Sequence, residues 1–201
     1  MSIVVVDSGG ANIASVLHAL RRLGADPLFT ADTETIRTAS RVILPGVGAA
    51  GRAMEVLRDH GLVEVIRTLA QPVLGICLGM QLLFESSEED HADLLGLIPA
   101  RLSRLPETGD CRVPHMGWNV LHSTRPDPLS GPLDGSWVYF VHSYAAPLGP
   151  WTLASSTHGN TFSAMVRQDN FYGTQFHPER SAAAGARLLQ GFLAEEGPGG
   201  N

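Results

Sequence analysis

The stretch "QPVLGICLGMQLLF", residues 71–84, carries the strongest structural signal in the chain. An apolar run over 71–76 leads into "GICLG" at 75–79, where two glycines frame Cys77. A glycine two residues before and two after a nucleophilic side chain is typical of the nucleophile elbow, a sharp turn between a strand and a helix. Glycine is needed there because the neighbouring backbone crowds the turn. The stretch therefore predicts a strand, a strained turn presenting the Cys77 thiol, and a helix over 80–89.

Outside this stretch, the first half of the chain alternates between short apolar runs and segments with helical spacing. Strand-like runs and helical segments fall, in order, at 2–7, 13–23, 26–30, 41–48 and 52–70. We expect Asn12 to cap the first helix and the last one to break near Gly61. Continuous apolar strands separated by helices predict an α/β fold with a central, mostly parallel sheet and helices on both faces.

The second half reads as consecutive strands joined by Pro, Gly and Asn turns. These strand-like runs lie at 113–123, 136–147, 151–158, 162–170 and 171–179. They predict antiparallel strands added to the parallel sheet.

The end of the chain predicts a closing helix over 181–196 and a flexible tail over 197–201. No internal repeat or linker divides the rest, so we expect a single domain over 1–196.

Composition excludes several classes of protein. The 201 residues carry a net charge of −6, and the arginines are scattered, so no basic stripe marks a nucleic-acid groove. Two cysteines, Cys77 and Cys111, do not make a disulfide framework. No apolar stretch is long enough to span a bilayer, and the N-terminus has no basic start of a signal peptide. We expect a cytoplasmic protein that needs no nucleic acid, membrane, metal or cofactor.

A cysteine nucleophile needs a base and a group that orients the base. The run "FYGTQFHPE" ends in His177, Pro178 and Glu179, and residues two apart in an extended chain point to the same side. A carboxylate beside an imidazole fixes its tautomer and stabilises the imidazolium. Because active sites of open α/β sheets lie at the carboxyl ends of strands, we expect His177 to meet Cys77 there. The alternatives are a surface His–Glu pair and a cysteine that merely fills the core.

Two backbone N–H groups are candidates for an oxyanion hole. Leu78 follows the nucleophile in the elbow. The loop "LPGVG", residues 44–48, follows a predicted strand, and Gly46 and Gly48 let its backbone approach a substrate, with Val47 as the donor. A plain strand-to-helix turn is the alternative for this loop. Its spacing does not match the dinucleotide or P-loop motifs.

The stretches "GICLGMQLLFE", "QFHPE" and "LPGVG" resemble the class I glutamine amidotransferases, Cys-His-Glu glutaminases of flavodoxin-like fold. The resemblance covers nearly the whole chain. It implies that Cys77 attacks the side-chain amide of glutamine and that His177, oriented by Glu179, protonates the leaving ammonia. The remaining positions that match the family's glutamine pocket are Gly46, Gly48, Gln81, His142, Ser143 and Tyr144.

The stretches "VPHMGWN" and "YFVHSYA", at 113–119 and 139–145, narrow the resemblance to one branch of the family. Its members form a heterodimer with a (β/α)8-barrel cyclase, a lyase of histidine biosynthesis, and channel ammonia into it. The cyclase makes imidazole glycerol phosphate and aminoimidazole carboxamide ribotide. The residues that the resemblance assigns to the partner interface are His115, Met116, Trp118 and Asn119. From the residues alone, this segment is a strand with an aromatic, and core packing of that aromatic is the alternative to an interface.

Three other functions remain open at this stage. The chain could serve another synthase, of anthranilate, carbamoyl phosphate, guanylate or pyridoxal phosphate. It could hydrolyse γ-glutamyl compounds alone. It could also be a non-catalytic, flavodoxin-like binding module in which Cys77 has no chemical role.

Overall fold

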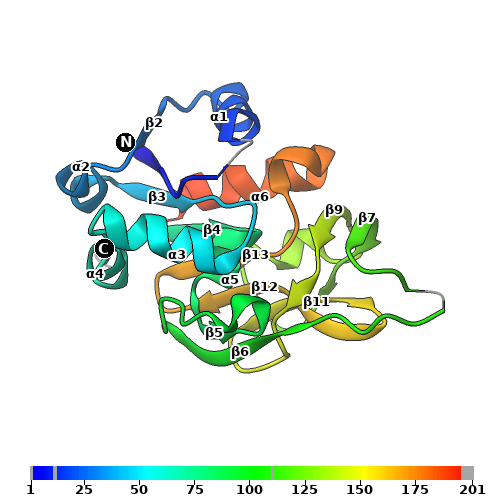
Figure 1. The fold of residues 1–201 in the computed structure, drawn as a ribbon. Helices are drawn as coiled ribbons and strands as arrows, with labels where there is room; N and C mark the ends of the chain where they lie inside the picture. Colours follow the sequence, from blue (N-terminus) through cyan, green and yellow to red (C-terminus); the bar gives the residue numbers. More distant parts are fainter. Residues whose placement is uncertain (1, 11–12, 110, 196–201) are drawn as a thin grey trace.

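A computed structural model describes residues 2–10, 13–109 and 111–195. An eight-stranded sheet runs through it (Figure 1). In spatial order the strands are β2 (Pro27–Thr30), β1 (Ile3–Val6), β3 (Arg41–Leu44), β4 (Val73–Ile76), β13 (Phe171–Thr174), β12 (Asn160–Gln168), β11 (Thr152–His158) and β8 (His122–Ser123). The first five are parallel and the last three are antiparallel. The predicted mostly parallel sheet is confirmed. The strand expected within 171–179 is β13, which pairs antiparallel with β12 and in parallel with β4, so it joins the parallel and antiparallel parts of the sheet.

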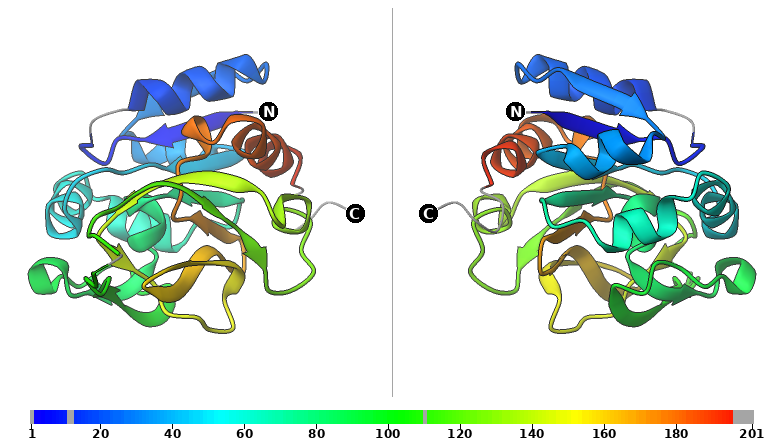
Figure 2. Two further views of the ribbon diagram at one scale, coloured as in Figure 1. Left: turned by 90° about the vertical axis from the view of Figure 1, so that its right-hand side faces the viewer. Right: turned by 90° about the vertical axis from the view of Figure 1, so that its left-hand side faces the viewer.

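Helices cover both faces of this sheet, as predicted. On one face lie α1 (Ile13–Arg22) and α6 (Ala182–Ala194), and on the other α2 (Thr33–Thr38), α3 (Ala50–Asp59) and α4 (Leu62–Arg67). Figure 2 shows α6 and α3 on opposite sides of the strands. Strand β1 illustrates the reason: Ile3 and Val5 enter the core with α1 and α6, while Val4 and Val6 enter the core with α3 and α4. A strand buried on both faces must be apolar throughout.

The predicted break between two helices falls at Gly61, whose φ of 67° separates α3 from α4. The predicted cap Asn12 and the tail at 197–201 lie outside the described residues, as does residue 196, where the domain is predicted to end. No helix within the described ranges is both long and apolar enough to cross a membrane.

The helix predicted over 80–89 is wrong. The structure has a single turn, α5 (Leu78–Gln81), followed by strand β5 (Phe84–Ser87). The reason is that the chain folds back on itself: the N–H groups of Leu95, Leu97 and Gly96 bond to the carbonyls of Leu82, Leu83 and Phe84, respectively, so these carbonyls serve a non-local contact. Strand β5 then pairs with β6 (Ile98–Arg104), which pairs with β10 (Tyr144–Ala145) in a three-stranded sheet. The sequence pattern did not predict this sheet.

A two-stranded ribbon packs beside the main sheet rather than joining it. It consists of β7 (His115–Val120) and β9 (Trp137–His142), paired in antiparallel register. One face of the ribbon is buried, and the other carries exposed side chains. Three short 3₁₀ turns complete the described elements: η1 (Glu89–His91), η2 (Gly131–Leu133) and η3 (Pro178–Arg180).

Candidate active site

Cys77 sits in a strained turn between β4 and α5, as the sequence predicts. Its φ of 53° and ψ of −108° lie outside the regions that side-chain-bearing residues ordinarily occupy. The glycines at 75 and 79 make the turn possible: a Cβ on Gly75 would lie 2.6 Å from the carbonyl oxygen of Gly79, and a Cβ on Gly79 would overlap the carbonyl oxygen of Leu44. Gly173, opposite Gly75 in β13, lets Met80 of α5 pack onto the sheet in the same way.

His177 and Glu179 are paired, although not by the predicted geometry. Strand β13 ends at Thr174, and the His177 N–H bonds to the carbonyl of Tyr139 in β9. Glu179 lies in the turn η3, so alternation along one strand does not bring the two side chains together. The turn brings them together instead: His177 Nδ1 lies 2.8 Å from Glu179 Oε1, and both side chains are buried. Because a carboxylate oxygen accepts, Nδ1 carries the proton, and Nε2 is left as the basic nitrogen.

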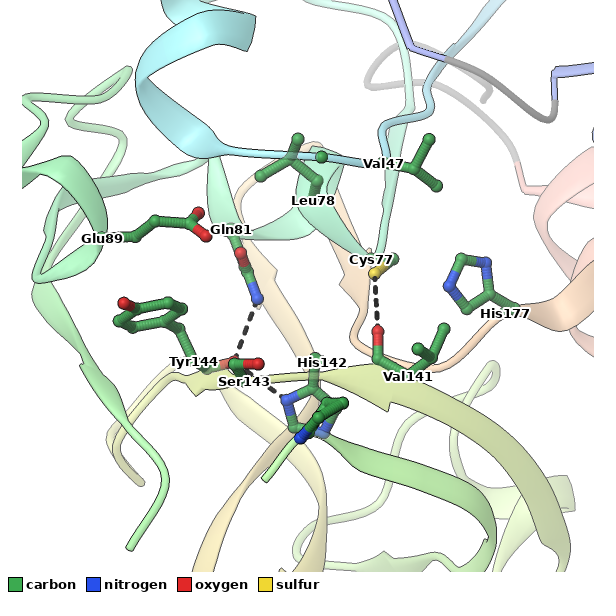
Figure 3. A pocket seen from close by; sticks show the side chains of 12 residues that line it. Val47, Cys77, Leu78, Gln81, Glu89, Val141, His142, Ser143, Tyr144 and His177 are labelled. Atoms are coloured by element: carbon green, nitrogen blue, oxygen red, sulfur yellow. Dashed lines mark hydrogen bonds between the residues drawn. The ribbon is translucent and has the colours of Figure 1, made fainter. Parts of the chain in front are cut away.

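The environment of His177 favours the imidazolium. Burial lowers the pKa of His177, but the neighbouring Cys77 and the hydrogen bond to Glu179 outweigh it and raise the pKa to about 10. Nε2 of His177 makes no hydrogen bond within the described part of the chain. Figure 3 shows the imidazole beside the Cys77 sulfur. The site therefore holds a thiol next to a base that is stabilised once it takes up a proton.

A cavity of about 320 Å³ opens in front of Cys77. Most residues that the sequence assigned to the glutamine pocket and the oxyanion hole line it (Figure 3): Val47, Gly48, Leu78, Gln81, His142, Ser143 and Tyr144. Gly46 and Glu179 are not among its lining residues; they border a small void next to it, together with Val47 and His177. Glu179 thus stands behind the imidazole, where it orients His177 without facing the cavity.

The two predicted oxyanion donors lie on the same side of the cavity (Figure 3). Leu78 begins α5, so its N–H has no carbonyl four residues earlier in the helix to bind. Val47 lies between Gly46 and Gly48, and Gly48 has a φ of 104° that favours glycine. A Cβ on Gly46 would come within 3.0 Å of the Leu78 Cβ, so glycine lets this loop lie against the elbow.

The structure adds two pocket features that the sequence analysis did not find. The carbonyl oxygen of Val141 lies 3.7 Å from the Cys77 sulfur and accepts its S–H. Glu89 lines the cavity across from Cys77, and its Oε2 accepts a 2.9 Å hydrogen bond from the N–H of Ala50 in α3. Burial raises the pKa of Glu89, while that hydrogen bond lowers it. Glu89 belongs to the acidic run "ESSEED", which alone resembles a solvated loop, so no sequence signal singled it out.

His142 forms a buried pair with His115 behind the pocket wall. His142 Nδ1 donates to the carbonyl of Tyr144 at 2.9 Å, and His142 Nε2 lies 3.0 Å from His115 Nδ1. Burial lowers the pKa of His142 to about 3, and burial together with repulsion from His158 lowers the pKa of His115 to about 4. Both imidazoles are therefore neutral at pH 7. His142 also lines the cavity, as the resemblance implied, whereas His115 is buried although it was assigned to an interface.

The outer face of the β7–β9 ribbon is apolar and exposed. The register places Met116 opposite Val141, Trp118 opposite Tyr139, and Val120 opposite Trp137. We call these six residues the ribbon face. Met116 is 64% exposed, Trp118 49% and Trp137 59%. The structure thus exposes two of the four predicted interface residues, leaves Asn119 partly buried, and buries His115. Val141 belongs to both the ribbon face and the pocket lining, so the two features adjoin.

A sharp turn presenting a thiol, a buried His–Glu pair and an adjoining cavity on this α/β sheet define a class I glutamine amidotransferase. The model of that family, "Glutamine amidotransferase class-I", matches residues 4–195, and the chain belongs to this family. Among its relatives is the imidazole glycerol phosphate synthase subunit HisH of Idiomarina loihiensis, 52% identical over 96% of this chain and 97% of that protein. The protein of the same name from Escherichia coli strain K12 is 48% identical over 96% and 99%.

Solved structures agree on the fold. One described as a glutamine amidotransferase superimposes with a TM-score of 0.72, at 23% identity, over 94% of this chain and 96% of that one. Another, described as PurLQS from Thermotoga maritima, gives a TM-score of 0.69 at 20% identity, over 96% and 97%. At this identity the likeness concerns the architecture alone. Within the described residues, no group of three or more His, Cys, Asp or Glu side chains is placed to hold a metal ion.

Proposed function

We propose that this chain is the glutaminase subunit of an imidazole glycerol phosphate synthase. It hydrolyses glutamine to glutamate and ammonia and passes the ammonia to a (β/α)8-barrel cyclase, in the cytoplasm, for histidine biosynthesis. The observation that carries this proposal is the pocket that joins Cys77 to His177, with Glu179 held 2.8 Å from His177 Nδ1. The HisH relatives, identical at about half of the positions over nearly the full chain, support the choice of synthase.

The first half of the reaction forms a thioester. His177 Nε2 takes the proton of the Cys77 thiol, and the thiolate attacks the side-chain carbonyl carbon of glutamine. The N–H groups of Leu78 and Val47 donate hydrogen bonds to the carbonyl oxygen and stabilise the negative charge that develops on it. The imidazolium of His177 then gives its proton to the departing nitrogen, which leaves as ammonia. A γ-glutamyl thioester on Cys77 remains.

The second half of the reaction consumes water. His177 Nε2 takes a proton from a water molecule, whose oxygen attacks the thioester carbonyl. The same two N–H groups stabilise the second oxyanion, the C–S bond breaks, and the sulfur regains a proton from His177. One glutamine and one water give one glutamate and one ammonia. The hydrogen bond between Glu179 and His177 Nδ1 stabilises the imidazolium in both halves.

Glutamine is positioned by the wall opposite the thiol. The carboxylate of Glu89 is the acidic group that lines this wall, and it suits the α-ammonium of the substrate. Gln81 and the backbone of Ser143 and Tyr144 line the path between Glu89 and Cys77 (Figure 3). A substrate held at both ends of this path presents its α-amino group to Glu89 and its side-chain amide to Cys77.

The ribbon face is the surface that we assign to the cyclase. Exposed Trp and Met side chains clustered on one face are typical of the core of a protein–protein interface. The ribbon face borders the pocket through Val141, so a partner docked there would cover the mouth from which ammonia leaves. Covering is needed because ammonia released into water at neutral pH becomes ammonium, which is not nucleophilic.

The experiment is to measure glutamate release from glutamine by the chain alone, with the barrel cyclase, and with the cyclase and its nucleotide ligand. We expect strong stimulation in the last mixture and none with Cys77→Ser. Glutamate release that the cyclase does not stimulate would indicate instead that the chain serves another synthase or hydrolyses γ-glutamyl compounds alone. No turnover in any mixture would favour a non-catalytic binding module.

A further inference from the structure

Gln175 is a fully buried amide that the reaction described above does not use. It follows β13 directly, and its side chain has no exposure to solvent. Its Nε2 lies 3.7 Å from the Cys77 sulfur, and its Oε1 lies 3.0 Å from Nε2 of Gln81. Because a buried amide must satisfy its hydrogen bonds within the protein, the orientation of this one is informative.

The orientation of both amides follows from one carbonyl group. Gln81 Nε2 also lies 3.0 Å from the carbonyl oxygen of Tyr144, and a carbonyl can only accept (Figure 3). The NH₂ group of Gln81 must therefore face Tyr144, which directs its second proton to Gln175 Oε1. The NH₂ group of Gln175 then has to face Cys77. Turning either amide over would oppose two oxygens or two donors in a buried site.

The Tyr144 carbonyl is itself held from a second direction. His142 Nδ1 donates to the same oxygen at 2.9 Å, and His115 Nδ1 donates to His142 Nε2. His115 Nε2 then accepts from Asn119, whose other amide proton bonds to the carbonyl of Thr157. Since both histidines are neutral, every bond in this row has one donor and one acceptor. The carbonyl that sets the amide orientation is thus fixed by two donors.

We propose that Gln175 stabilises the thiolate form of Cys77, with its N–H directed at the sulfur by Gln81 and the Tyr144 carbonyl. In the resting thiol, the S–H bonds to the carbonyl of Val141. When the proton moves to His177 Nε2, the S–H bond breaks and the sulfur becomes an acceptor facing a carbonyl oxygen. The N–H of Gln175 offsets that unfavourable contact and stabilises the charged form.

This inference deepens the proposed function and rests on Cys77 being its nucleophile. The titratable groups around the sulfur are His177 and Glu179 on one side and His142, Tyr144 and Glu89 on the pocket wall. All of them are present in the Gln175 variants. A change at Gln175 therefore reports the contribution of its N–H to the sulfur.

The test follows alkylation of Cys77 by iodoacetamide from pH 5 to 10, read by intact mass. A Cys111→Ser background leaves Cys77 as the single thiol of the chain. Gln175→Met keeps the length of the side chain and removes the donor. We expect the pH of half-maximal alkylation to rise by about one unit and the rate at pH 7 to fall about tenfold. The rate on the high-pH plateau should change by less than about threefold, since thiolate nucleophilicity depends weakly on basicity.

Gln71→Met is the matched control. Gln71 is a partly buried glutamine before β4 whose amide bonds to the carbonyl of Ile36, so the same substitution there removes an amide hydrogen bond far from the sulfur. We expect its alkylation profile to match the parent. A profile of Gln175→Met that also matches the parent would overturn the proposal.

A second variant covers the case in which methionine disrupts the fold. Gln175→Glu keeps an oxygen for Gln81 and turns an oxygen toward the sulfur, so it should shift the profile upward further than Gln175→Met. An unshifted profile in a folded Gln175→Glu variant would refute the role of the N–H. Alkylation needs no glutamine turnover. Failure of the proposed function would therefore appear separately, as a parent chain that shows the Gln175 effect but releases no glutamate with any partner.

Discussion

The buried histidine pair predicts a specific loss of stability in mild acid. Burial lowers the pKa of His142 to about 3, from an ordinary value of 6.5 that the unfolded chain retains. Between these two pH values the unfolded state binds a proton that the folded state does not. The contribution of His142 to stability is therefore fully present above pH 6.5 and is lost progressively as the pH falls toward 3. His115 acts in the same direction down to about pH 4.

The size of the effect depends on how far the pH lies below the ordinary pKa of histidine. At pH 5, about 1.5 units below the ordinary pKa, His142 costs about 2 kcal/mol of unfolding free energy. His115 costs about as much at pH 5, because its pKa of about 4 leaves it neutral there as well. A loss of about 4 kcal/mol corresponds to a fall in Tm of roughly 8 to 16 °C for a domain of this size. His177 does not add to this slope, because its pKa is shifted upward, in the direction opposite to those of His142 and His115.

The perturbation is His142→Gln, which keeps a donor for Tyr144 and an acceptor for His115 but cannot titrate. Tm should be measured by calorimetry at pH 7 and pH 5 for the parent, for His142→Gln and for the exposed control His122→Gln. We expect His142→Gln to lose less Tm between the two pH values than the parent, by roughly 4 to 8 °C. The control should follow the parent, because His122 is exposed. An equal loss in all three chains would refute the reasoning that burial holds His142 neutral.

Three further predictions concern the pocket. Gly79→Ala should lower Tm and abolish glutamate release, because its Cβ would overlap the Leu44 carbonyl; a parent-like Tm in calorimetry would contradict the strained turn. Glu179→Gln should lower kcat about 10²- to 10⁴-fold with little change in KM, since the imidazolium loses its carboxylate partner 2.8 Å away. An unchanged kcat in steady-state kinetics would show that this hydrogen bond has no role in catalysis. Glu89→Gln should raise KM for glutamine about tenfold or more, while Glu88→Gln, outside the pocket lining, should not; equal KM values would remove Glu89 from substrate binding.

The parts of the fold that depend on local patterns were predictable from the sequence. Apolar runs without alternation predicted the parallel strands, because such strands are buried on both faces. The two glycines around Cys77 predicted the strained turn, because their role is steric and local. Helix α2 and strands β5 and β6 were not predicted. The pairing of β5 with β6 depends on non-local contacts, such as the hydrogen bond from the Leu97 N–H to the Leu83 carbonyl. No short window of sequence reveals such a contact.

In the candidate site, too, the residues in short local motifs were predictable and those placed by distant contacts were not. Cys77, His177 and Glu179 stand out through short motifs, although a turn rather than a strand joins the last two. Glu89 and the Val141 carbonyl were missed, because the first lies in an ordinary acidic run and the second is a backbone atom. The burial of His115 was also missed: in a two-stranded ribbon, the face that each residue takes depends on the packing partner, and that partner is distant in sequence.

The central claim is that Cys77 forms a covalent γ-glutamyl thioester. The most direct measurement is to stop the complex with cyclase and nucleotide ligand by acid during turnover of glutamine and to map the acylated peptide by mass spectrometry. The account predicts a γ-glutamyl group on the peptide that contains Cys77, lost on treatment with hydroxylamine and absent in Cys77→Ser. A γ-glutamyl group on Cys111, or steady glutamate release by the Cys77→Ser complex, would contradict it.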